Sequence, residues 1–137
     1  MNDPDALDKM EELKAMDISC DAVIILGERY HELALELAEK EADPVRKEEL
    51  KQIAANLEVV PAHAPQTYWQ AIQLYWFTHL AVTTELNPWD AFSPGRLDQH
   101  LIKYYEADTE AGILDDERAK RTVRVLMGEI LQSACTG

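Results

Sequence analysis

The chain contains 137 residues, of which 26 are acidic and 13 are basic, and its formal net charge is −13. This length fits one ordinary domain, and a hydrophobic fraction of 47% excludes wholesale disorder. The excess of acids excludes a nucleic-acid-binding protein and disfavours an anionic membrane surface, because both attract lysine and arginine. Cys20 and Cys135 form no C-x-x-C motif, so they predict no zinc or redox centre. The acidic start of the chain has no apolar run, which predicts a cytoplasmic protein.

The first forty residues predict two helices. The first spans residues 4–16, with Pro4 in its first turn. Asp17, Ser19 and Asp21 are residue types that favour helix N-caps, so a second helix is expected to start among them. Its apolar face recurs at steps of three and four residues, at Val23, Leu26, Tyr30, Leu33 and Leu37.

The character of the sequence changes after a third helix, which is expected to begin at Pro44 and to carry Leu57 on its apolar face. No charged residue occurs from position 59 to position 84, a stretch of 26 residues. Its first part holds two prolines and predicts an extended connector, and its second part predicts a helix over residues 67–84 with Thr67 as N-cap. That helix is apolar nearly all round but is interrupted by polar side chains, so it is expected to be buried by protein rather than by lipid.

The remaining sequence predicts a loop and two more helices. Residues 87–96 contain two prolines and a glycine and are expected to form the loop. A helix follows and ends at Gly112, and a last helix starts at Asp115 and Asp116. Because no convincing strand pattern is present, the predicted fold class is all-α, with five to six helices.

The histidines give only weak indications of chemistry. Glu28 and His31 form a Glu-x-x-His pair of the type found in di-iron helical bundles, but no second pair exists, so no metal site is predicted. His79 lies on the apolar helix and is expected to be a hydrogen-bonded core residue. His63 lies between two prolines, and its surroundings define no role.

The segment ELNPWDAFSPGR is the most unusual stretch, because polar and aromatic residues alternate directly after a buried helix. A carboxylate near an interior needs a partner, so Asp90 beside Trp89 is a candidate acceptor for a cationic or hydroxylated substrate. The alternative is structural: Asp90 caps the turn, and Arg96 pairs with Glu85 or Asp98. The residues alone leave both interpretations open.

The strings YWQAIQLYWFTHL, TELNPWDAFSPGRLDQHLIKYYEAD and GILDDERAK resemble the large domain of glycyl radical enzymes, the pyruvate formate-lyase-like family. The resemblance covers residues 7–121, and its most specific piece is GRLDQHLIKYY with SPGR ahead of it. Residues 1–137 are therefore expected to form a single, partial domain of this family. The loop TELNPWDAFSPGR is more similar to the dehydratase-like branch of the family, which includes enzymes that dehydrate hydroxyproline, than to pyruvate formate-lyase itself.

The resemblance implies an anaerobic enzyme built on a ten-stranded α/β barrel, with this chain forming part of its helical wall. In that family a radical S-adenosylmethionine activase installs a glycyl radical, which passes to a cysteine that abstracts hydrogen from a small-molecule substrate. The reactions include dehydration, C–N and C–S cleavage and formate C-acetyl transfer. The resemblance makes Asp90 a substrate contact, with Trp89 and Phe92 shaping the pocket. It implies structural roles for Ser93, Gly95, Arg96 and Asp98.

The chain departs from the family at the radical motifs. Neither cysteine has the family's Gly-Cys setting, and none of the five glycines lies in its Arg-Val-Ser/Ala-Gly-Tyr type motif. We therefore expect no catalytic residue, cofactor or metal in this chain and predict that it is inactive alone. It would supply helical scaffold and one substrate-facing loop to the remainder of a glycyl radical enzyme, or self-associate through residues 67–84. The alternatives are a stand-alone acidic helical module that binds a protein partner, or a fragment of a formate C-acetyltransferase.

Overall fold

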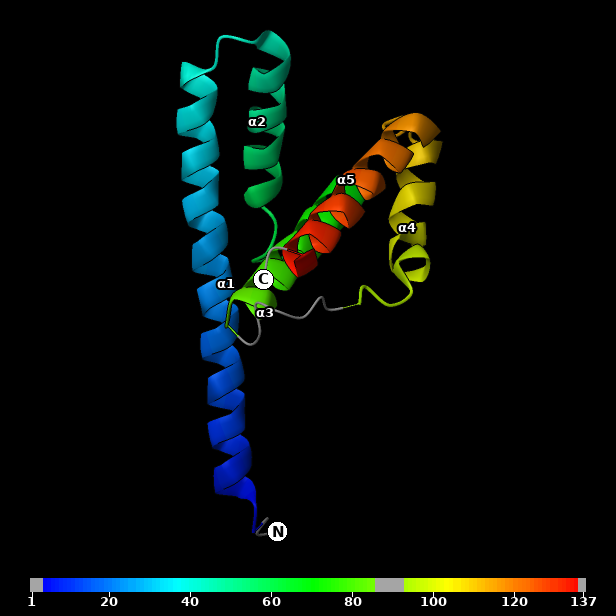
Figure 1. The fold of residues 1–137 in the computed structure, drawn as a ribbon. Coiled ribbons are helices and arrows are strands. Elements are labelled where there is room, and N and C mark those ends of the chain that lie inside the picture. Colours follow the sequence, from blue (N-terminus) through cyan, green and yellow to red (C-terminus); the bar gives the residue numbers. More distant parts are fainter. Residues whose placement is uncertain (1–3, 86–92, 136–137) are drawn as a thin grey trace.

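The structure is a computed structural model that describes residues 4–85 and 93–135, with side chains described as far as residue 128. Within these ranges it contains five α-helices and no strand, which confirms the predicted all-α class. The helices are α1 (Ala6–Lys40), α2 (Pro44–Leu57), α3 (Tyr68–Glu85), α4 (Leu97–Glu110) and α5 (Asp116–Cys135). Helices α1 and α2 form one antiparallel pair, while α3, α4 and α5 form a second group beside it (Figure 1). None of the described helices is long and apolar enough to cross a membrane.

The prediction of two helices before residue 41 is wrong, because α1 runs unbroken through the expected start of the second helix. Asp17, Ser19 and Asp21 lie inside α1, and all three are exposed to water. The Ser19 hydroxyl donates to the Ala15 carbonyl at 2.8 Å, so the cap-type side chain is satisfied within the helix. No glycine or proline lies between residues 5 and 26 to end the helix. A serine or aspartate in a helix interior lowers helix stability by only about 0.5 kcal/mol relative to alanine, so these residues do not break the helix.

Helix α2 starts as the sequence predicts and packs closely on the second half of α1. The carboxylate of Asp43 accepts from the Val45 amide at 3.0 Å, and Pro44 occupies the first turn. On α1, Ala34 and Ala38 are buried, and these small side chains allow the two helices to lie close together.

The connector after α2 crosses α1 at a glycine. A Cβ atom built on Gly27 would lie 2.5 Å from Cδ of Pro61, so only glycine fits at this crossing. One turn further along α1, Nδ1 of His31 donates to the Ala54 carbonyl at 2.9 Å. These contacts fix the position of the connector against α1.

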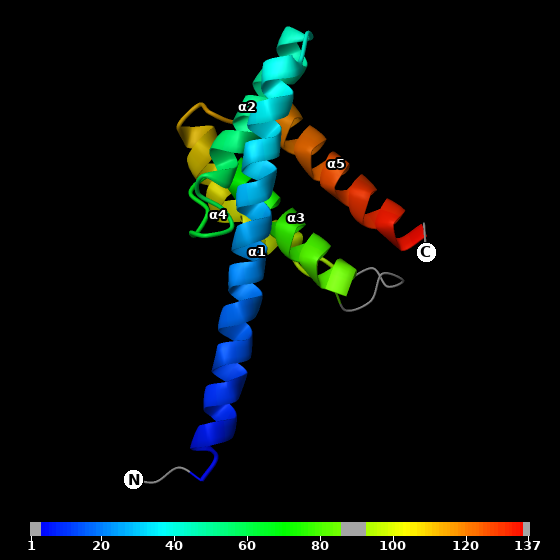
Figure 2. The same ribbon diagram turned by 90° about the vertical axis from the view of Figure 1, so that its left-hand side faces the viewer.

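Helix α3 is the centre of the second group. Its first half contributes to a buried apolar cluster shared with α4 and α5, and Figure 2 shows α3 running between α1 and these helices. The buried members of the cluster are Tyr68, Ala71, Ile72, Leu101, Ala119 and Leu126. Near the other end of α3, the rings of Phe77 and Tyr30 of α1 meet edge to face, with centroids 5.4 Å apart.

Short-range capping bonds set the ends of these helices. The Thr67 hydroxyl accepts from the Gln70 amide at 3.2 Å, which agrees with its predicted role as N-cap of α3. Helix α4 ends at Glu110, and Gly112, which follows the C-cap residue Ala111, has a φ of +70° that suits glycine. The carboxylate of Asp115 accepts from the Arg118 amide at 2.7 Å and caps α5.

The carboxylate of Asp108 connects the end of α4 to the start of α3. It is buried, and its Oδ2 accepts from the Tyr68 amide at 2.8 Å. The side chain thus satisfies a free N–H group in the first turn of α3 from a residue 40 positions away in sequence.

The first half of α1 extends beyond the rest of the molecule. In both views the N-terminal part of this helix projects past α2 and the other helices (Figures 1 and 2). Its large apolar side chains are accordingly exposed, including Leu7, Leu13, Met16 and Ile18.

Candidate functional site

The three residues predicted to meet substrate, Trp89, Asp90 and Phe92, lie outside the described residues. The structure does describe both helices that flank them. Helix α3 ends at Glu85, and α4 begins at Leu97 after a short turn. These two helices contact each other, so the predicted substrate loop connects two neighbouring helices of the second group.

The turn before α4 contains the residues for which structural roles are predicted. Gly95 has a φ of +62°, and its amide donates to the Ser93 hydroxyl at 3.3 Å. The Arg96 guanidinium lies 3.5 Å from the Asp98 carboxylate. Of the two carboxylates considered for Arg96 from the sequence, the structure therefore pairs it with Asp98. Both side chains are exposed, so the pair adds little stability.

His79 is buried on α3, as predicted, but the expected hydrogen bond is missing within the described residues. Its Nε2 is enclosed and has no hydrogen-bond partner there. The imidazole stacks against the rings of Tyr75 and Trp76, whose centroids are 6.2 and 5.9 Å away. Burial lowers the pKa of His79, so the neutral form is favoured. A cavity of about 170 Å³ adjoins it, lined also by Thr78 and Val82.

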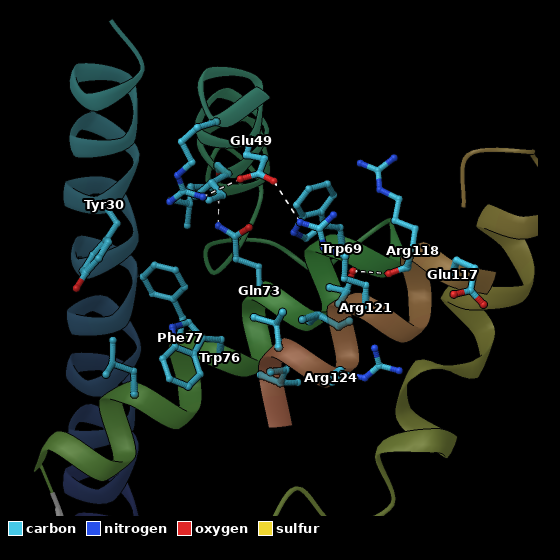
Figure 3. Close-up of a pocket in the computed structure, with 18 of the residues that line it drawn as sticks. Tyr30, Glu49, Trp69, Gln73, Trp76, Phe77, Glu117, Arg118, Arg121 and Arg124 are labelled. Atoms are coloured by element: carbon cyan, nitrogen blue, oxygen red, sulfur yellow. Dashed lines mark hydrogen bonds and ion pairs between the residues drawn. The ribbon is translucent and has the colours of Figure 1, made fainter. Parts of the chain in front are cut away.

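A groove of about 1020 Å³ lies between α2, α3 and α5, with Tyr30 of α1 at one end (Figure 3). Its floor is apolar and consists mainly of residues of the helix that the sequence predicts to be buried on every side. The apolar lining includes Ile53, Trp69, Ile72, Trp76, Leu80 and Leu126. The groove is therefore the place where the described chain leaves the apolar surface of α3 uncovered.

Arginines are concentrated along this groove. The chain has six arginines, and only Arg29 and Arg96 lie elsewhere. The four that line the groove, Arg46 of α2 and Arg118, Arg121 and Arg124 of α5, face three carboxylates, Glu49, Asp115 and Glu117. In a chain with a net charge of −13, this is a local excess of positive charge.

Two of these arginines meet a single carboxylate. Glu49 accepts from Arg46 at 2.9 Å and lies 3.6 Å from Arg121, so it bridges α2 to α5. The Arg118 guanidinium stacks over the Trp69 ring at 4.9 Å from its centroid, a cation–π contact (Figure 3).

A buried amide network lies beneath the groove. The Asn56 side chain donates to Oε1 of Gln73 at 2.9 Å, and the Gln73 amide donates to the Ile53 carbonyl at 3.3 Å. Gln52 donates to Oδ1 of Asn56 at 3.0 Å. Each amide is hydrogen-bonded, so the network joins α2 to α3 without a buried unpaired group.

Sequence reasoning missed this groove, because its walls come from four helices that lie far apart in sequence. A local pattern was nevertheless present: Arg118, Arg121 and Arg124 recur every third residue on a helix that is otherwise mixed in charge. The Glu28–His31 pair shows no metal-binding geometry. Glu28 is exposed and His31 is bonded to a carbonyl, and the described residues contain no cluster of three potential metal ligands.

Comparison with known proteins defines the family. The family model described as pyruvate formate lyase-like matches residues 1–131, and the chain therefore belongs to this family. The matched segment includes residues 122–131, which the motif comparison had left outside. The chain is 57% identical over 126 residues to trans-4-hydroxy-L-proline dehydratase of Clostridioides difficile. It is 41% identical over 115 residues to isethionate sulfite-lyase of Desulfovibrio desulfuricans.

Solved structures show the same relationship. Hydroxyproline dehydratase from Clostridioides difficile, crystallised with trans-4-hydroxy-L-proline, superposes on 91% of this chain with a TM-score of 0.86 and 58% identity. A glycyl radical enzyme from Archaeoglobus fulgidus superposes on 85% of it with a TM-score of 0.70 and 35% identity. The match to the dehydratase covers 92% of this chain but only 16% of the length of that relative. The match to the sulfite-lyase covers 84% of this chain and 14% of the length of that relative. It covers 16% of each of the two structures.

Proposed function

We propose that this chain acts as part of a larger cytoplasmic glycyl radical enzyme of the dehydratase branch. It would supply helical wall and present the loop of residues 86–96 to substrate. The observation that carries the proposal is 57% identity to trans-4-hydroxy-L-proline dehydratase along almost the whole chain. A superposition at a TM-score of 0.86 adds that these helices have the arrangement they have inside a whole enzyme.

The radical groups would come from segments outside this chain. Cys20 is exposed on α1 and lines neither of the two hollows described above, which does not fit a cysteine enclosed with substrate. The five glycines also lack the family's sequence setting. The chain's own contribution would therefore be to position and bind substrate, not to generate or carry the radical.

Within this proposal, Asp90 accepts a hydrogen bond from the substrate, and Trp89 and Phe92 shape the pocket around it. A hydroxyproline carries both a cationic nitrogen and a hydroxyl group, and a carboxylate forms strong bonds with either. The loop connects two helices that contact each other, and Asp108 links them at their ends away from the loop.

A chimaeric enzyme tests the proposal. The matching segment of the Clostridioides difficile dehydratase is replaced by residues 1–131 of this chain, which match the family model. The hybrid is activated anaerobically, and dehydration of trans-4-hydroxy-L-proline is measured. We expect the hybrid to be active, and Asp90→Asn to lower kcat/KM about 100-fold, since truncating a buried charged contact costs about 2–5 kcal/mol. Asp98→Asn is the matched control, because its exposed carboxylate only pairs with Arg96.

Three results would argue against the proposal. A hybrid that folds and carries the radical but does not turn over hydroxyproline would reject the dehydratase assignment. Equal losses from Asp90→Asn and Asp98→Asn would reject the specific role of Asp90. Formate-dependent acetyl transfer by the hybrid would favour the acetyltransferase alternative.

A further inference from the structure

His79 is a buried side chain of α3 whose hydrogen bonding is incomplete. The residue is 5% exposed, and its Nε2 has no partner within the described part of the chain. The other buried polar side chains there, Asn56, Gln73 and Asp108, all have hydrogen bonds. A buried nitrogen without a partner destabilises the folded state, and native proteins seldom leave one unpaired. The free Nε2 of His79 therefore needs an explanation.

The imidazole ring of His79 is held by two aromatic neighbours. Its plane lies 15° from that of the Tyr75 ring and 28° from that of the Trp76 ring. Burial lowers the pKa of His79, so the ring is neutral, and its Nε2 either donates or accepts one hydrogen bond. A charged partner without a counter-charge would be costly to bury in these surroundings. The chemistry of the ring therefore fits an uncharged polar partner.

A hollow of about 170 Å³ shows from which direction a partner can come. It is lined by Tyr75, Thr78, His79 and Val82, which follow each other at helical spacing and form one face of α3. No residue of another described helix lines it. The Thr78 hydroxyl already donates to the Leu74 carbonyl of its own helix at 3.0 Å. A group seated in this hollow must therefore come from a segment other than α3.

We propose that a segment of the larger enzyme outside this chain covers this face of α3 and hydrogen-bonds Nε2 of His79 through an uncharged polar group. The inference rests on the proposed function, in which this chain is a small part of a longer enzyme. The match to the dehydratase covers 16% of the length of that relative, so most of the enzyme is available to supply the group. The bond would hold α3 six residues before Glu85, where the segment proposed to meet substrate begins.

Hydrogen exchange of the α3 amides, followed by mass spectrometry in the isolated chain and in the hybrid enzyme described above, tests the proposal. His79→Phe keeps a ring that can stack but removes both nitrogens. In the isolated chain, exchange should be unchanged or slower, because an unpaired buried nitrogen has been removed. In the hybrid, it should be about tenfold faster, because the group of the surrounding enzyme loses its partner.

Two further variants separate the hydrogen bond from packing. His79→Gln keeps a donor and an acceptor at the end of a side chain of similar reach, so exchange in the hybrid should stay within about threefold of the parent. Thr78→Val is the matched control, because Thr78 lines the same hollow but its hydroxyl is bonded within α3. Its effect should be the same in the isolated chain and in the hybrid.

The opposite behaviour of His79→Phe in the two settings, with rescue by His79→Gln, supports the proposal. Equal acceleration in both settings would overturn it, because the partner would then be a water molecule or a group of this chain. Equal acceleration by His79→Phe and His79→Gln in the hybrid would also overturn it, and so would no acceleration there. Exchange needs a folded hybrid but no turnover. A folded, inactive hybrid that shows the reversal would therefore reject the dehydratase assignment and keep this contact.

Discussion

The carboxylate of Asp108 is predicted to keep the first turn of α3 closed. It accepts from the buried Tyr68 amide at 2.8 Å and places a negative charge at the positive end of the α3 dipole. Asp108→Ala removes both effects and leaves that amide without a partner. The cost of a buried unsatisfied N–H group is about 1–3 kcal/mol, so we expect about 2 kcal/mol.

Amide hydrogen exchange measures this cost where it arises. A local opening energy lower by about 2 kcal/mol corresponds to exchange about 30-fold faster at Tyr68. Asp108→Asn keeps an acceptor oxygen but loses the charge. It should therefore cost only about 0.7 kcal/mol, or about threefold in exchange rate. Exchange reports local opening directly, so the result does not require the whole chain to unfold in one cooperative step.

Asp98→Ala is the matched control, because this residue is an exposed acid in the first turn of α4. It should leave the exchange of the Tyr68 amide unchanged. The reasoning is refuted if Asp108→Ala does not accelerate exchange at Tyr68, or if Asp108→Asn and Asp108→Ala accelerate it equally. The second result would mean that charge alone, without the hydrogen bond, stabilises the start of α3.

Three further predictions concern stability. Burial lowers the pKa of His79, so the unfolded chain binds more protons than the folded chain as the pH is lowered from about 6.5. The free energy of unfolding should therefore decrease as the pH is lowered through this range, by at most about 1.4 kcal/mol per pH unit. His79→Gln should remove this part of the pH dependence, as measured by urea unfolding at several pH values. Gly27→Ala should cost about 1–3 kcal/mol in urea unfolding, since its Cβ would meet Pro61, whereas Gly128→Ala, with open space around it, should be neutral or stabilising. Gly112→Ala should lower the free energy of unfolding by about 1 kcal/mol, because the φ of Gly112 is +70°. An unchanged midpoint of urea unfolding would contradict the need for a left-handed conformation at this position.

Much of the fold could be predicted because its helix boundaries have local chemical causes. Asp43 with Pro44, Thr67 and Gly112 all act at the positions that the sequence indicates. The predicted break near Ser19 was wrong for the opposite reason. N-cap residues favour a helix start only where the preceding chain leaves the helix, and no residue there forces it to do so.

The sites were less accessible to sequence reasoning. The loop containing Asp90 was recognised through a family resemblance, and its role stays a prediction. The groove depends on how α5 lies across α3, which is a property of tertiary packing. Asp108 was not singled out either, since its partner Tyr68 is 40 residues away and no local spacing marks the pair.

The hydrogen bonds between Asn56 and Gln73 have a consequence for the orientation of α3. A helix that is apolar on nearly all sides can rotate about its own axis within apolar surroundings with little change in free energy, because hydrophobic contacts have no preferred direction. Turning α3 by one residue, about 100°, would separate Gln73 from both Asn56 and the Ile53 carbonyl and leave buried amides unpaired. The hydrogen bonds of these two side chains therefore restrict α3 to one rotation about its own axis. That rotation determines the direction in which the chain leaves α3 at Glu85, and with it the starting point of the segment proposed to meet substrate.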